Sequence, residues 1–194
     1  MNLHYYVSTL LLACTVGVNA EPKWAGMENL PDGPYSGVNM VNGSTTMTHM
    51  VTGEQYTFHI VDDGKPSMRR LKRSDYAVSQ RSNALGKRGT DCWGYQLDVG
   101  GVDRGVQALK NWANNGVFLH SCRRNNYYGF NDNGVYVYYC INSQFFEGNL
   151  NVGDINEALS NMDGTCRRYE AGYFRWNSPE LVGKCRSGTP VCLG

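Results

Sequence analysis

Apolar residues recur at helical spacing in two segments of the second half of the chain. Val102, Val106, Leu109 and Trp112 lie three or four positions apart, and the stop signal Asn114-Asn115-Gly116 follows them. This spacing predicts a first helix. A second helix is predicted to begin at Asp154, since Asp154 and Glu157 have the spacing of a capping box. The inward face of the second helix is formed by apolar residues at helical spacing: Ile155, Ala158, Leu159 and Met162.

Alternating patterns predict the strands, of which 135–141 is the clearest. Successive side chains of a strand point to opposite faces, so Tyr136 and Tyr138 fall on one face and Val135, Val137 and Tyr139 on the other. Both faces cannot lie in solvent, so part of this set belongs to the core. The turn-rich stretch 127–134 ends in Asn-Gly and predicts a hairpin loop before that strand. Further strands are expected at 117–119, at 169–176, within 181–192 and around 93–97.

The order of these elements is helix, strand, strand, helix, strand, strand. Helices gathered on one face of an antiparallel sheet give an α+β fold, here an α/β sandwich with two helices packed on a small antiparallel sheet.

The first twenty residues have the pattern of a signal peptide. An apolar run over 7–16 is followed by Val18-Asn19-Ala20, whose small residues suit signal-peptidase cleavage after Ala20. The run is shorter than the roughly 20 residues that cross a bilayer, so we expect no membrane-spanning segment and a secreted, extracellular protein.

The cysteines divide the rest of the chain at the junction Gly86-Lys87-Arg88-Gly89. Apart from Cys14, every cysteine follows this junction. We therefore expect a cysteine-free propeptide over 21–88, removed by a kexin-type protease that cuts after Lys87-Arg88, and a mature domain over 89–194. The pair Lys72-Arg73 is a second candidate processing site, because the stretch around it is a linker by composition.

The propeptide itself holds little apolar sequence. Residues 51–61 alternate loosely and predict one or two strands, which is too little to form a core alone. Asn42-Gly43-Ser44 is a glycosylation sequon, which makes Asn42 a candidate for modification.

Six cysteines remain after loss of the signal peptide, and an even number in a secreted domain predicts three disulfides whose pairing stays open. Paired cysteines cannot act as nucleophiles, since the thiolate is the reactive species. There is no C-x-x-C pair and a single histidine beyond residue 59, so we expect no metal site and no cofactor. The six cysteines are Cys92, Cys122, Cys140, Cys166, Cys185 and Cys192.

The charge of the expected mature domain argues against a nucleic-acid partner. From Gly89 onward there are nine basic and ten acidic residues, a net charge of −1, whereas nucleic-acid binders carry a basic excess. The pairs Arg123-Arg124 and Arg167-Arg168 remain as local basic patches. The oligomeric state stays open.

Two kinds of catalytic arrangement are open, one with the single histidine of the expected mature domain and one without it. His120 with Glu147 or Glu157, or a carboxylate pair such as Asp98 and Asp103, would suit a small hydrolase of the ribonuclease or glycosidase kind. No Gly-x-Ser-x-Gly elbow occurs. The simpler interpretation is structural, with acidic residues at helix ends and His120 at a strand end, so binding is favoured over catalysis.

Aromatic residues exceed what a core of this size needs. Those expected on loops form a candidate contact surface for a protein or cell-surface target: Tyr127, Tyr128, Phe145 and Phe146.

Four short stretches carry a resemblance to known proteins. They are Asp91-Cys92, the strand end Tyr138-Tyr139-Cys140-Ile141, the helix start 152–156, and the terminal 188–192. From Asp91 to its end the chain resembles small secreted fungal proteins matured after Lys-Arg, the necrosis-inducing extracellular effectors and killer-toxin-like α/β sandwiches. The resemblance implies a virulence effector or toxin that binds a host or competitor target, with no catalytic residues to carry over.

Overall fold

The computed structural model describes residues 23–61, 88–116, 118–122 and 124–193. The predicted signal peptide and the basic residues Lys72, Arg73 and Lys87 lie outside these ranges.

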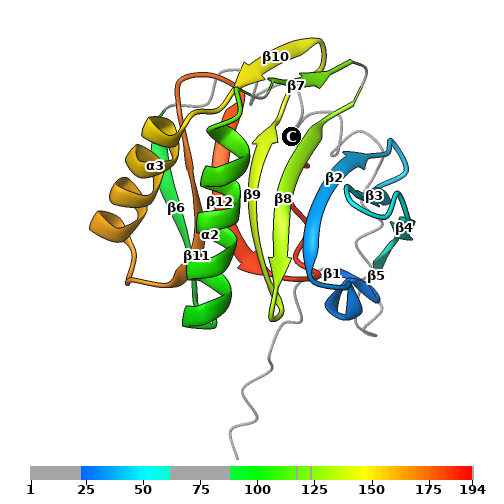
Figure 1. Ribbon diagram of the computed structural model, residues 1–194, viewed down its shortest axis with the longest axis horizontal. Helices are drawn as coiled ribbons and strands as arrows, with labels where there is room; N and C mark the ends of the chain where they lie inside the picture. The colour runs from blue at the N-terminus through cyan, green and yellow to red at the C-terminus, as the bar shows by residue number, and fades with distance from the viewer. Residues whose placement is uncertain (1–22, 62–87, 117, 123, 194) are drawn as a thin grey trace, which may run out of the picture.

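A large antiparallel sheet organises the described residues (Figure 1). Its eight strands have the order β4-β3-β2-β8-β9-β12-β11-β6. The helices α2 (Val99–Ala113) and α3 (Val152–Thr165) lie on one face. The predicted α+β class with two helices is confirmed, but the sheet is large rather than small. Its strands are β2 (Gly33–Asn39), β3 (Thr45–His49), β4 (Gln55–Phe58), β6 (Gly89–Gln96), β8 (Asn126–Asp132), β9 (Val135–Ile141), β11 (Glu170–Arg175) and β12 (Glu180–Arg186).

Two smaller antiparallel pairs flank this sheet. β7 (Phe118–Ser121) pairs with β10 (Phe146–Asn149), and the two form a ribbon at the top of the view in Figure 1. β1 (Lys23–Trp24) pairs with β5 (Ile60–Val61), and the short 3₁₀ helix η1 (Met27–Asn29) follows β1.

Both helices begin at capped positions slightly earlier than predicted. Asp98 caps α2, where its carboxylate accepts a hydrogen bond of 2.7 Å from the Gly101 amide. The capping box of α3 joins Asn151 and Asp154 instead of Asp154 and Glu157. The box therefore begins three residues earlier than predicted. Asn151 is the N-cap whose side chain accepts from the Asp154 amide, and Asp154 is the third residue of the helix.

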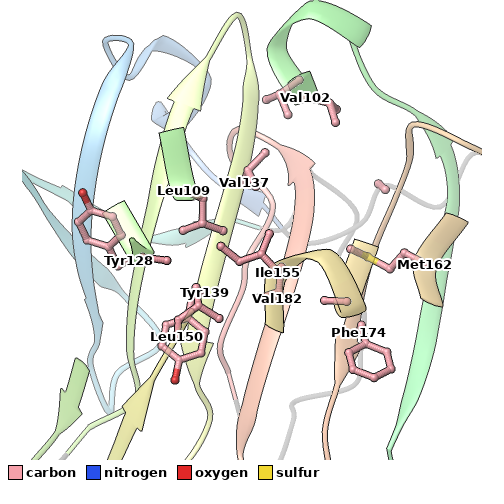
Figure 2. Close-up of a cluster of buried hydrophobic side chains, with 14 of the residues drawn as sticks. Val102, Leu109, Tyr128, Val137, Tyr139, Leu150, Ile155, Met162, Phe174 and Val182 are labelled. Atoms are coloured by element: carbon pink, nitrogen blue, oxygen red, sulfur yellow. The ribbon is translucent and has the colours of Figure 1, made fainter. Parts of the chain in front are cut away.

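All seven residues of β9 are buried, and the strand separates two hydrophobic clusters. On the helix side Val137, Tyr139 and Ile141 pack with α2 and α3, as Figure 2 shows for the labelled Val137 and Tyr139 beside Leu109 and Ile155. Tyr136 and Tyr138 point to the other face. The alternation predicted for this strand is confirmed.

Residues 23–61 supply much of the second cluster. β2 pairs with β8 from Gly33 to Val38, and a Cβ at Gly37 would collide with the Tyr127 ring. Pairing with β2 and β9 makes residues 127–132 of the predicted loop part of the strand β8, while the predicted hairpin turn is present at Asn133-Gly134. The segment has too few apolar residues to form a core of its own, but here it contributes them to a core that it shares with β8 and β9. Its buried members are Trp24, Met27, Leu30, Tyr35, Met47 and Phe58.

The carboxyl terminus closes the same face. The Trp24 amide donates to the Gly188 carbonyl at 2.8 Å, and the Asn39 side-chain amide donates to the carbonyls of Val191 and Cys192. Hydrogen bonds therefore tie the first described strands to the last residues of the chain.

Two disulfides are formed, and the prediction of three is wrong. Cys92–Cys166 joins the edge strand β6 to the end of α3, and Cys140–Cys192 joins β9 to the carboxyl terminus. Cys122 is exposed after β7, whereas Cys185 is fully buried in the second cluster. The even count predicted a third bridge, but the fold places these last two thiols in different environments.

We expect the two free thiols to react at very different rates. Burial raises the pKa of the Cys185 thiol well above its usual range, so little thiolate forms there. A thiol reagent should label one cysteine of the native protein without its signal peptide, and two after denaturation. Cys122→Ser should remove the native labelling. A denatured protein with no reactive thiol would instead show a Cys122–Cys185 bridge.

Candidate functional site

The predicted contact residues divide between core and surface. Tyr127 and Tyr128 are 0% and 6% exposed, one in each hydrophobic cluster, so they cannot serve as contact residues. Phe146 is half-buried against the helix-side cluster. Phe145, in contrast, is 75% exposed. The surface therefore centres on the segment that carries Phe145, which leads into β10.

The strand β7, which pairs with β10, carries a second exposed aromatic side chain. Phe118 is opposite Asn149, and His120 is opposite Glu147. The Phe145 amide continues the ladder by donating to the Cys122 carbonyl at 3.0 Å. Phe118 is 64% exposed. These residues, Phe118, His120, Cys122, Phe145, Glu147 and Asn149, are all exposed, and we call them the ribbon surface.

The opposite side of the ribbon holds it against the body of the protein. Leu119 and Phe146 pack against the helix-side cluster. Within the ribbon, the Ser121 hydroxyl donates to the Phe146 carbonyl and accepts from the Phe146 amide, each at 3.1 Å, which joins β7 to β10. Gly148 lies against the Tyr139 hydroxyl, where a Cβ would collide. Because one side is anchored through these contacts, the ribbon surface is presented in a defined orientation.

His120 and Glu147 form the one histidine–carboxylate pair that the sequence predicted and the structure brings together. His120 Nδ1 lies 3.1 Å from Glu147 Oε1, and the two side chains are 56% and 74% exposed. The pair stands on the outer side of a two-stranded ribbon, where water reaches both partners. This geometry suits hydrogen bonding to a partner, and it also offers a proton donor and an acceptor to a bound substrate.

The other predicted carboxylates lie elsewhere. Asp98 caps α2, and hydrogen bonds from Asn133 and from the Gly101 amide lower the pKa of its carboxyl. Asp103, on α2, approaches the Tyr169 hydroxyl at 3.5 Å. Glu157, on α3, accepts a hydrogen bond of 2.9 Å from the Trp176 indole. None of these contacts involves His120.

A cleft of about 240 Å³ adjoins the ribbon through Asn149. Trp176 forms one wall, and Asp154 and Glu180 supply two carboxylates. Glu180 accepts hydrogen bonds from the hydroxyls of Tyr139 and Ser178. Burial and the bond to Glu180 raise the pKa of Tyr139, so its hydroxyl stays a donor. The cleft combines an aromatic wall with negative charge, and the sequence analysis did not identify it.

Of the predicted processing residues, the structure describes Arg88. Its side chain forms an ion pair with Glu157, and its guanidinium carbon lies 5.4 Å from the centre of the Phe174 ring. Its amide donates to the Asn177 side chain at 2.8 Å. β6 begins at the next residue, Gly89. Arg88 is thus docked on the surface just before the start of an edge strand.

Three further features bear on function. Asn42 is exposed in the turn between β2 and β3, and its side-chain oxygen accepts from the Ser44 amide and hydroxyl. Within the described ranges, no group of three or more His, Cys, Asp or Glu side chains could hold a metal ion. No helix in the described part of the chain is long and apolar enough to cross a membrane.

Sequence reasoning missed Phe118 and Trp176 as surface residues, although Phe118 carried a signal. Phe118 and His120 alternate with Leu119 and Ser121, which is the pattern of a strand with one outer face. Which of the two faces is exposed depends on the pairing of β7 with β10, and the local sequence of β7 does not reveal a partner that lies more than twenty residues away.

Comparison with protein-family models, with curated proteins and with solved structures found no match to this chain.

Proposed function

We propose that this protein is a secreted effector or toxin-like protein that binds a protein on a host or competitor cell through the ribbon surface. The observation that carries the proposal is the exposure of Phe118 and Phe145 on one anchored ribbon. Large exposed aromatic side chains with polar neighbours are typical of binding surfaces, where such residues contribute most of the binding energy. The His120–Glu147 pair lies on the same surface and supplies polar contacts.

Secretion is supported by the apolar amino terminus and by the disulfides Cys92–Cys166 and Cys140–Cys192. Disulfides form and persist in oxidising compartments.

Replacing both exposed phenylalanines should weaken binding without unfolding the protein. Phe118→Ser with Phe145→Ser removes aromatic contacts that typically contribute about 2 kcal/mol or more at a hot spot, so we expect at least about tenfold weaker binding. The measurement is binding of labelled protein to intact cells of a susceptible host or competitor. Val41→Ser with Val51→Ser is the matched control, since these side chains are 89% and 78% exposed outside the ribbon. Equal binding by both double variants would refute the role of the ribbon.

Maturation is proposed to occur by cleavage after Lys87-Arg88, and the packing argues that residues 23–61 stay bound afterwards. β2 is hydrogen-bonded to β8, and Trp24, Tyr35 and Met47 are fully buried in the shared cluster. Release would expose this apolar surface to water, at a cost of roughly 25 cal/mol for each Å². The mature protein is therefore a complex of two chains held together without a disulfide between them.

Cleavage with a kexin-type protease should give two fragments that separate on a denaturing gel but elute together from a gel-filtration column. The thermal midpoint of the cut protein should rise with protein concentration, because its two chains associate. Lys87→Ala with Arg88→Ala, combined with Lys72→Ala and Arg73→Ala at the second predicted site, should prevent cleavage at both pairs and remove that dependence. Loss of residues 23–61 from the native cut protein would contradict the two-chain form.

A small secreted hydrolase is the second candidate, because His120 and Glu147 are 3.1 Å apart. His120→Ala distinguishes the two functions. Acid–base catalysis contributes about 10²- to 10⁴-fold to a rate, so an enzyme would lose activity to that extent while keeping its fold. We expect a much smaller loss, of the size produced by one polar contact at an interface. The measurement is biological activity at matched protein concentration, with circular dichroism to verify the fold.

A further inference from the structure

The environment of Arg88 is a ready-made site for a positively charged side chain. Its guanidinium meets the Glu157 carboxylate and lies 5.4 Å from the centre of the Phe174 ring, within the range of a cation–π contact. The Asn177 side chain accepts a hydrogen bond of 2.8 Å from the Arg88 amide. One residue is therefore recognised through its charge and its backbone together.

The carboxylate of this site is held in place by a neighbour that also forms the cleft. The Trp176 indole donates to Glu157 at 2.9 Å, and the Phe174 ring meets Trp176 edge to face at 5.2 Å. Fixed hydrogen bonds orient a carboxylate toward the cation that it binds. Because Trp176 is also a wall of the cleft, the Arg88 site and the cleft form one continuous surface.

The charge of this surface favours a cation. Glu157 is paired with Arg88, while Asp154 and Glu180 add two carboxylates in the cleft, which has no basic residue among its described lining residues. Removal of the Arg88 side chain would leave Glu157 unpaired beside Phe174 and Trp176, with Asp154 and Glu180 in the adjoining cleft. Such an arrangement is suited to an arginine side chain, which combines a permanent charge with a planar face that stacks on aromatic rings.

We propose that Glu157, Phe174, Trp176 and Asn177 form a binding site for an arginine side chain of the target protein, and that Arg88 occupies this site until the junction is cut. This inference rests on the proposed function, since it assigns the target's chemistry and a role for processing. In the cut, water adds across the Arg88–Gly89 peptide bond. The carboxylate stays on Arg88, and the proton goes to the new amine of Gly89. Arg88 is then no longer attached to β6 and can be exchanged for an arginine of the target.

The test uses the full chain with Arg88→Ala, in which the site is vacant without any cleavage. The probe is N-acetyl-arginine N-methylamide, which keeps the guanidinium and the amide that Arg88 presents. We expect the probe to shift the NMR signal of the Trp176 indole N–H in Arg88→Ala and to leave it nearly unchanged in the wild type. The citrulline analogue has the same length without the charge, and it should bind at least about tenfold more weakly. Trp176→Phe identifies the signal.

Two variants in the Arg88→Ala background provide the control. Glu157→Gln should abolish the shift, whereas Asp103→Asn, which removes a carboxylate on the other helix, should preserve it. Four results would each overturn the proposal. The shifts could be equal in wild type and Arg88→Ala, or the citrulline probe could bind as well as the arginine probe. The shift could also persist in Glu157→Gln, or be absent from every protein. The experiment requires neither the target nor a protease. Its failure is therefore distinct from a failure of the ribbon variants.

Discussion

The structure depends on a single constraint, the burial of β9 on both of its faces. A strand buried on both faces needs a covering layer on each side of the sheet. On one side α2 and α3 provide it, with the small residues Gly101 and Gly105 letting α2 approach Val135 and Val137 closely. On the other side the cover comes from the two ends of the described chain, residues 23–61 and the segment after β12. Neither cover is contiguous with β9 in sequence.

This constraint changes the meaning of the basic junction. A leader that only preceded the domain would leave once it was cut, but here the segment before the junction contributes three strands to the sheet. This segment also supplies a hydrogen-bond partner for a buried polar group of the core, since the Thr45 hydroxyl lies 2.5 Å from the buried Tyr127 hydroxyl. Cleavage at the junction would therefore alter the surface around Arg88 more than the core.

The proposed binding elements all lie outside the doubly covered region. The ribbon of β7 and β10 is anchored through Leu119, Phe146 and Gly148 but leaves Phe118 and Phe145 in solvent. The cleft continues from Asn149 to Trp176, and Trp176 leads to the site of Arg88. A rigid sheet with two cores thus supports one connected surface, in which an aromatic part and an acidic part are joined. A protein target with an apolar patch beside an arginine would match both parts.

The sequence by itself determined the elements that local periodicity encodes. The helical spacing from Val102 to Trp112, the second helix near Asp154 and the alternation within β9 were all readable, because side-chain direction follows from backbone geometry over a few residues. The division of the cysteines about Lys87-Arg88 was equally visible. Only the tertiary structure decided which cysteines pair, because a disulfide requires two particular Cα positions to approach, and Cys122 and Cys185 lie in different environments. It also decided that Tyr127 and Tyr128 are core residues and that residues 23–61 belong to the sheet. Burial of a strand depends on partners that are distant in sequence, and alternation reveals that a strand has two faces but does not show what covers each of them.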